Sequence, residues 1–135
     1  MTATAPTVDS ATTGARRTAR VALLGASGYA GQEFIRLALG HPGLQLAALV
    51  SREHAGRPAT ALMPGVDARA ARLPEVVSPE QLPALAASGA FDTLVTALPH
   101  GAFRTFAAEH AAWISGLACV VDLSGDHRDG ADGYA

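Results

Sequence analysis

The stretch GASGYAG at residues 25–31 decides the fold of this chain, because of what stands on either side of it. The apolar run at residues 21–24 precedes it, and a run with helical character at residues 32–40 follows it. A strand, a glycine-rich turn and a helix in this order form the opening of a dinucleotide-binding βαβ unit. The alternative is a tight turn from strand to helix that binds no ligand.

Each glycine of this turn has a predicted task. Gly25 is suited to turn the chain off the strand, Gly28 to let a pyrophosphate approach the backbone, and Gly31 to let the helix pack against the strand. We expect the amides at the helix start, including those of Tyr29 and Ala30, to bind the anion. The Ser27 hydroxyl is a further candidate donor.

Composition narrows the possible functions. The chain has 135 residues, of which 49% are hydrophobic, and this suits one domain with a substantial core. Its net charge of −2 gives no indication of a nucleic-acid partner. All ten basic residues are arginine, so the chain has neither a P-loop lysine nor a Schiff-base lysine.

The single cysteine, Cys119, excludes an internal disulfide and a multi-cysteine metal site, and we expect no metal. We expect a cytoplasmic location, with no membrane partner, because no apolar run is long enough to span a bilayer and the first residues lack a signal-peptide core. Residues 1–19 are interpreted as a disordered leader, and a transit peptide is the less favoured alternative.

From residue 20 onward, strand-like and helix-like runs alternate, which is typical of a parallel sheet with crossover helices. We therefore predict one α/β domain over residues 20–135, a Rossmann-like, doubly wound parallel sheet with helices on both faces. The predicted strands are residues 20–24, 44–50, 72–77, 92–98 and 117–123, and the predicted helices are residues 29–39, 78–88 and 101–114. Residues 51–66 read as a long loop, which is unusual unless the loop has a function.

The end of the second predicted strand reads Ser51-Arg52. In this type of fold that position faces the adenosine ribose, where a carboxylate would select NAD. A hydroxyl and a guanidinium suit a 2′-phosphate instead, so the sequence favours NADP as the cofactor. The alternative is that Arg52 is a solvated loop residue.

Two further strand ends carry polar residues. Pro99, His100 and Gly101 follow the fourth predicted strand, and His100 is equally consistent with a cofactor contact and with a cap on the next helix. The run at residues 122–128 follows the fifth, and in it Ser124 and Arg128 are candidates for the substrate side of the site. A turn with an ion pair between residues 126 and 128 is the simpler alternative.

Cys119 lies inside the fifth predicted strand, so we expect its thiol to be buried and inert. Phe106 and Trp113 lie on one helical face and are expected in the core. The chain thus offers no candidate catalytic residue.

Taken in order, the glycine turn, the Ser51-Arg52 pair, the Leu-Pro-His-Gly segment at residues 98–101 and the Asp-Leu-Ser segment at residues 122–124 resemble N-acetyl-gamma-glutamyl-phosphate reductase. The resemblance runs from residue 20 to the end. Gly125 and His127 depart from it, since the family usually has alanine and phenylalanine there. The glycine turn alone would also fit an aspartate-semialdehyde dehydrogenase relative.

The resemblance implies an NADP-dependent oxidoreductase of arginine biosynthesis that reduces a small-molecule acyl phosphate to a semialdehyde and works as a homo-oligomer. It also implies that this chain is a fragment, because the catalytic cysteine of the family stands further along, in a Pro-Gly-Cys context. We therefore expect this chain alone to be inactive. A non-catalytic dinucleotide-binding or interaction module is the alternative.

Overall fold

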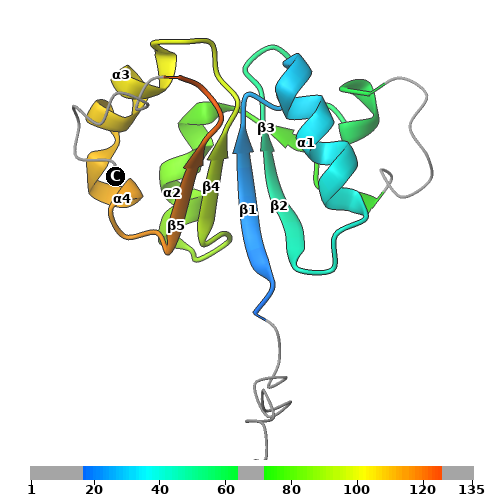
Figure 1. The fold of residues 1–135 in the computed structure, drawn as a ribbon, viewed down its shortest axis with the longest axis horizontal. Helices are drawn as coiled ribbons and strands as arrows, with labels where there is room; N and C mark the ends of the chain where they lie inside the picture. The colour runs from blue at the N-terminus through cyan, green and yellow to red at the C-terminus, as the bar shows by residue number, and fades with distance from the viewer. Residues whose placement is uncertain (1–16, 64–71, 126–135) are drawn as a thin grey trace, which may run out of the picture.

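The computed structural model describes residues 17–63 and 72–125, and at its centre is a parallel sheet of five strands in the order β3-β2-β1-β4-β5 (Figure 1). The strands are β1 Ala19–Leu24, β2 Leu44–Val50, β3 Val76–Val77, β4 Thr93–Thr96 and β5 Cys119–Asp122. The chain runs outward from β1 through β2 to β3 and then returns to the other side of β1. The predicted doubly wound order is confirmed, and its switch point lies between β1 and β4.

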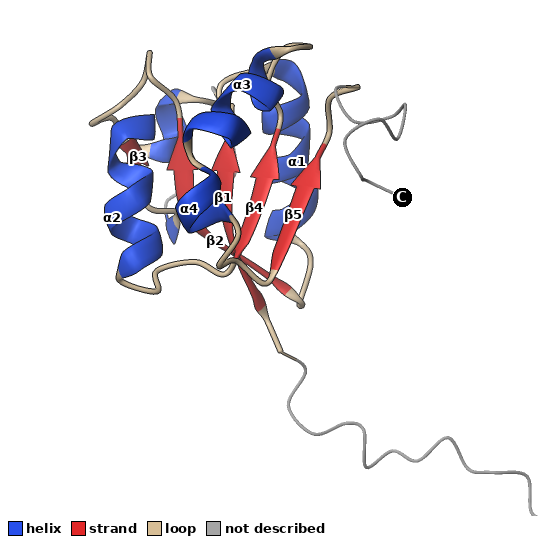
Figure 2. Ribbon diagram, turned by 90° about the vertical axis from the view of Figure 1, so that its left-hand side faces the viewer, coloured by secondary structure: helices blue, strands red, loops and turns tan. Residues whose placement is uncertain are grey.

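Helices cover both faces of the sheet (Figure 2). Helix α1, Tyr29–Leu39, lies on one face. The other face carries α2 Leu82–Ala87, α3 Ala102–Glu109 and α4 Ala111–Ile114. Two 3₁₀ turns, η2 Ala59–Ala61 and η4 Pro79–Gln81, complete the described elements. Within those residues, no helix is both long enough and apolar enough to cross a bilayer.

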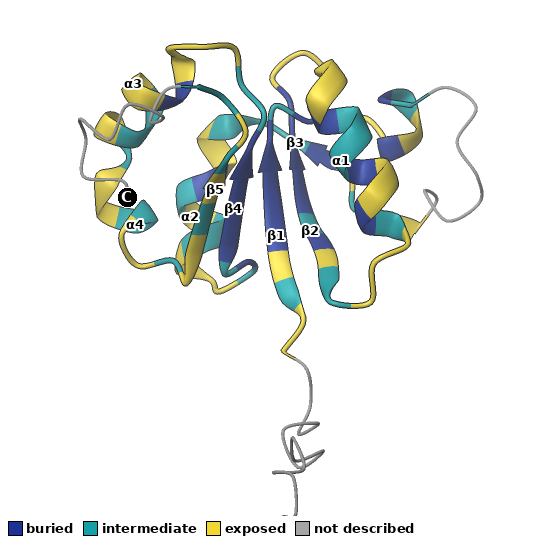
Figure 3. Cartoon of the chain, in the orientation of Figure 1, coloured by how far each residue is buried: buried dark blue, intermediate teal, exposed yellow. Residues whose placement is uncertain are grey.

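Each face of the sheet has its own apolar core, and the central strands are buried between the two (Figure 3). On one face Ile35 and Ala38 of α1 are buried against β1 and β2, while Phe34 and Leu39 are partly buried there, as the helical pattern predicts. On the other face, the fully buried Leu82 of α2 and Phe103 of α3 occupy the core. The near-continuous apolar sequence of β1 and β2 follows from this burial on both sides.

The sequence predicts α1 and β2 with the observed bounds, but β3, β4 and β5 are shorter than expected. Strand β1 begins one residue early, because the amide of Ala19 donates to the carbonyl of Gly43 at 2.9 Å. Residues 1–16 of the predicted leader lie outside the described residues. The long loop after β2 includes η2 and is held to β3, where Val76 donates its amide to the carbonyl of Arg57 at 2.9 Å.

The predicted helix over residues 101–114 is wrong in one respect, because it is interrupted at His110. The backbone of His110 has φ −117° and ψ 19°, outside the helical region. Beyond the break, the Trp113 indole donates to Nδ1 of His110 at 3.1 Å and meets Phe91 and Phe106 edge to face, each at 6.1 Å between ring centroids. The aromatic contacts explain the interruption, and Phe106 and Trp113 are only partly buried.

The prediction that Cys119 is buried is wrong, since its side chain is exposed. Strand β5 stands at the edge of the sheet, where Val120 packs against the core beneath α3 while Cys119 and Val121 face the opposite way and are exposed. An apolar sequence alone does not reveal that a strand is at an edge. Cys119 pairs with Thr93, at the amino ends of β5 and β4.

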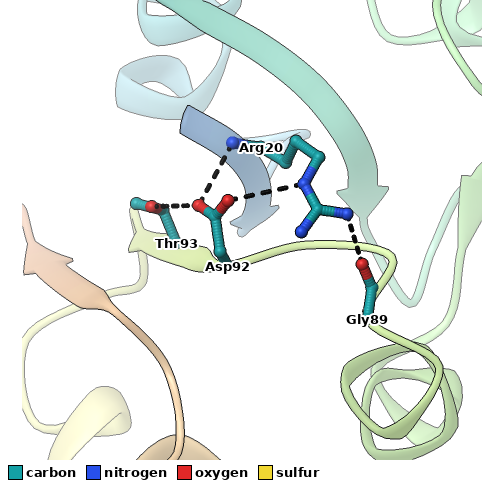
Figure 4. Close-up of polar contacts among 4 residues, drawn as sticks. All are labelled: Arg20, Gly89, Asp92 and Thr93. Atoms are coloured by element: carbon teal, nitrogen blue, oxygen red, sulfur yellow. Dashed lines mark hydrogen bonds and ion pairs between the residues drawn. The ribbon is translucent and has the colours of Figure 1, made fainter. Parts of the chain in front are cut away.

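Asp92 ties three strands together at this amino edge (Figure 4). Its Oδ1 accepts from the hydroxyl of Thr93 at 2.8 Å and from the amide of Arg20 at 3.2 Å, and its Oδ2 faces the Arg20 guanidinium at 3.4 Å. The same guanidinium donates to the carbonyl of Gly89. Because the amide of Ala118 also donates to the Asp92 carbonyl at 3.0 Å, this residue links the starts of β1, β4 and β5.

Two glycines of the turn are required by the packing of the chain itself. Gly25 has φ +86°, and a Cβ there would lie 2.6 Å from the carbonyl oxygen of Ala97. A Cβ on Gly31 would lie 2.2 Å from the carbonyl oxygen of Gly25. The predicted tasks of these two positions, turning the chain and bringing helix and strand together, are therefore met.

Replacing Asp92 by Asn is expected to lower the free energy of unfolding by about 1 kcal/mol at pH 7, a modest value because the carboxylate is partly exposed to solvent. The pKa of Asp92 is lowered, first by the hydrogen bond from Thr93 and then by the amide and guanidinium of Arg20. Its contribution is thus present above the unfolded-state pKa and is lost as the pH falls through the folded-state pKa. Urea unfolding of both proteins from pH 7 downward should show the difference shrinking in acid, and a constant difference would contradict this.

Replacing Gly31 by Ala is expected to destabilise the protein by about 2–3 kcal/mol, because the methyl group meets the backbone of Gly25 and the helix must shift. Gly28→Ala is the matched control in the same turn. Its φ is −73° and a Cβ would lie 3.6 Å from the nearest atom, so its stability should change by no more than about 0.5 kcal/mol. Chemical unfolding measures both, and equal losses would show that the turn is not packed in this way.

Candidate functional site

The start of α1 forms an anion-binding arrangement at the carboxyl edge of the sheet. The first hydrogen bond of the helix runs from the amide of Gln32 to the carbonyl of Gly28 at 2.9 Å, so the amides of Tyr29, Ala30 and Gly31 come before the helical ladder. The first turn holds no acidic residue that would offset the partial positive charge of the helix end. This end of α1 is therefore suited to a phosphate.

Gly28 differs from the other two glycines of the turn, because the chain does not require a glycine there. Its backbone is extended, and a Cβ would make only ordinary van der Waals contact. Gly28 lines a cavity, whereas Gly31 is buried in the first turn of the helix. The missing side chain at Gly28 keeps the cavity open beside the helix start, as the close approach of a pyrophosphate demands.

A chain of hydroxyl groups connects this turn to the end of β2. The buried Ser51 donates from its hydroxyl to Oγ of Ser27 at 3.0 Å, and Nδ1 of His54 lies 3.4 Å from the Ser51 oxygen. Since the Ser27 oxygen accepts the Ser51 hydrogen, its own hydrogen is available to another acceptor. The Ser27 hydroxyl therefore remains a candidate donor, while Ser51 is buried and bonds to Ser27.

Arg52 stands next to Ser51 at the mouth of the same cavity. Its side chain is 74% exposed, and Nη1 lies 2.5 Å from Oε1 of Glu80, which follows β3 on the turn η4. No local sequence pattern predicts this ion pair, because the partners are far apart in the chain. The pKa of Glu80 is lowered, chiefly by the hydrogen bond from its own backbone amide and next by that of Arg52.

The cavity has a volume of about 550 Å³, within the range usual for small-molecule and cofactor sites, and it opens at the switch point between β1 and β4. Six of the predicted residues line it: Gly25, Ser27, Gly28, Ser51, Arg52 and Pro99. The sequence reasoning missed the wall from α3 and the strand ends: Leu24, Val50, Glu53, Pro79, Ala97, Leu98, Ala102, Thr105, Phe106 and Glu109. Residues 102, 105, 106 and 109 have the spacing of one helical face, and this pattern could have predicted that α3 forms a wall of the cavity.

His100 and Gly101 are not among the residues that line the cavity. Gly101 is the N-cap residue of α3 with φ +87°, so its glycine is explained by the turn conformation. His100 is exposed and precedes this N-cap position, so it is not itself the N-cap residue. Pro99, in contrast, lines the cavity, three residues after the end of β4.

At the end of β5, Asp122 and Ser124 bond to each other. Asp122 accepts from the amide of Ser124 at 2.9 Å and from its hydroxyl at 2.8 Å, and it also accepts from the buried Thr96 hydroxyl at 2.9 Å. These bonds fix the turn after β5. The alternative ion pair between residues 126 and 128 lies outside the described residues. Arg128, the other candidate for the substrate side, lies outside the described residues.

Comparisons with known proteins agree with this geometry. The family model for the semialdehyde dehydrogenase, NAD binding domain, matches residues 20–132. The N-acetyl-gamma-glutamyl-phosphate reductases of Paenarthrobacter aurescens and Streptomyces coelicolor are 40% and 38% identical over 82% and 81% of this chain. The chain spans 29% of the length of each of these enzymes. The predicted resemblance is confirmed over that part.

Two further proteins are similar to this chain in sequence or in fold. The protein arg-6, mitochondrial, of Neurospora crassa is 38% identical over 83% of this chain, which covers 13% of its length. The crystal structure of aspartate semialdehyde dehydrogenase with NADP from Candida albicans superposes with a TM-score of 0.58 over 82% of this chain and 31% of its own, at 21% identity, and so shows the fold. From the family match over residues 20–132, the chain belongs to the semialdehyde dehydrogenase, NAD binding domain, family.

Proposed function

We propose that this chain is the NADP-binding part of an N-acetyl-gamma-glutamyl-phosphate reductase, an oxidoreductase that reduces an acyl phosphate to a semialdehyde in arginine biosynthesis. The family match and the named reductases support this assignment. The observation that carries it is the cavity at the sheet's switch point, where Gly28 and the open start of α1 stand together.

The residues present fit an NADP molecule. The turn at residues 25–31 and the Ser27 hydroxyl would hold the pyrophosphate, since three amides precede the helical ladder there and the first turn of α1 has no acidic residue. Arg52 would bind the 2′-phosphate through a charge-assisted hydrogen bond. NADP is also the nucleotide named with the related fold from Candida albicans.

When bound, NADPH supplies a hydride, and the residues of this chain bind it, orient it and exclude water. The apolar side chains of Leu98, Pro99 and Phe106 form a wall of the cavity at the end of β4 and on α3. Such a wall shields a planar ring from solvent while the polar groups at the other strand ends fix its orientation. Thr105 and Glu109 add a hydroxyl and a carboxylate to this wall.

Cys119 takes no part in this chemistry. It lies at the amino end of β5, whereas the cavity opens at the carboxyl ends of β1, β2 and β4. The chain alone is therefore inactive in this proposal, because its one thiol stands at the wrong edge of the sheet. The proposal also includes a cytoplasmic location, a single domain over residues 20–135 and a homo-oligomeric full-length enzyme.

Arg52→Ala is expected to weaken NADP⁺ binding by about 1–3 kcal/mol, the range for a charged hydrogen bond, and to leave NAD⁺ binding nearly unchanged. The reason is that only NADP⁺ carries the 2′-phosphate. Isothermal titration calorimetry of both nucleotides with both proteins measures the difference.

Arg36→Ala is the matched control, since Arg36 is also an exposed, ion-paired arginine but does not line the cavity. It should alter the affinity for neither nucleotide. Equal losses for NADP⁺ and NAD⁺ in Arg52→Ala would show that this residue does not read the 2′-phosphate. Failure of the unaltered chain to bind either nucleotide would refute the proposed function.

A further inference from the structure

We propose that Glu80 sets how strongly this cavity prefers a 2′-phosphorylated nucleotide, by competing for Arg52 and by opposing the phosphate beside it. The inference rests on the proposed function, because it concerns the same cavity and the same arginine. Glu80 does not line the cavity, although its neighbour Pro79 does. It acts from just outside the mouth, through the guanidinium that would receive the phosphate.

The backbone holds Arg52 and Glu80 next to each other. Arg52 follows the end of β2 and Glu80 follows the end of β3, and the amide of Ser51 donates to the carbonyl of Val77 at 3.1 Å between those two strand ends. The turn that carries Glu80 is fixed by its own cap, in which the amide of Ser78 donates to Oε1 of Gln81 at 3.0 Å. The backbone of Glu80 therefore stays beside the cavity mouth whatever the arginine does.

The charge of Glu80 also persists without Arg52. The largest cause of its lowered pKa is the hydrogen bond from its own backbone amide, ahead of the bond from Arg52. Glu80 is thus ionised at neutral pH even when the guanidinium turns toward a ligand. Other charged or titratable groups at the cavity are Glu53 and Glu109, which line it, and His54, which contacts Ser51.

Two opposing effects decide whether Glu80 raises or lowers the affinity for a 2′-phosphorylated nucleotide. Both partners of the ion pair are mostly exposed, at 74% and 61% of their side-chain surface, and such pairs hold an arginine only weakly. Losing Glu80 therefore costs little in the positioning of Arg52. A 2′-phosphate carries nearly two negative charges at neutral pH, so a carboxylate a few ångströms away repels it and also occupies its partner. Glu80 accordingly reduces the preference for the phosphorylated nucleotide.

The test uses adenosine 2′,5′-bisphosphate and adenosine 5′-monophosphate, which differ only in the 2′-phosphate. Calorimetry should show that Glu80→Gln binds the bisphosphate roughly three- to tenfold more tightly at low salt, with the monophosphate unchanged. The gain should shrink at high salt, where surface charges are screened. Glu53→Gln is the matched control for a carboxylate at the same mouth that is not paired with Arg52, and its gain should be smaller.

Both variants are surface substitutions, and their thermal unfolding checks that they are folded. Unchanged or weaker binding of the bisphosphate by Glu80→Gln, or an equal change for both ligands, would overturn the inference while leaving the proposed function intact. If the unaltered chain binds neither these ligands nor NADP⁺, the proposed function fails and this inference fails with it.

Discussion

The close approach of helix α1 to the end of β1 is the constraint on which the rest of the structure depends. The carbonyl of Gly25 lies where a Cβ on Gly31 would have to be, and Gly25 itself stands against the carbonyl of Ala97 after β4. These backbone contacts bring β1, α1 and the end of β4 together. They also place the first amides of α1, which precede the helical hydrogen-bond ladder, in the same turn as Gly25, Ser27 and Gly28, which line the cavity.

The two edges of the sheet differ, because the amino edge carries a stabilising polar network and the carboxyl edge carries the cavity. At the amino edge, Asp92 and Arg20 bond to each other and to the strand starts, and this network serves stability. At the carboxyl edge, the polar residues Ser27, Ser51 and Arg52 line a cavity. Parallel strands make this division possible, because every strand ends at the same edge. Cys119, although exposed, belongs to the amino edge and is remote from the cavity.

The sequence could predict the elements whose signals are local. The glycine turn, α1 and β2 follow from short-range patterns, and six predicted residues line the cavity for the same reason. Cys119 is exposed because β5 lies at the edge of the sheet. The break at His110 depends on aromatic packing, and the Arg52–Glu80 pair depends on two loops that meet in space. No local pattern encodes such long-range relations, so these features required the structure.

The most direct test of the account is to map where NADP⁺ contacts the chain, by following backbone amide signals in nuclear magnetic resonance spectra during titration. The account predicts that the largest shifts occur at Ser27, Gly28 and Tyr29 in the turn and at Ser51 and Arg52 after β2, with the amides of Asp92 and Cys119 unaffected. Shifts concentrated at the amino edge, or no shifts in the turn at saturating nucleotide, would contradict the claim that the start of α1 is a phosphate-binding site.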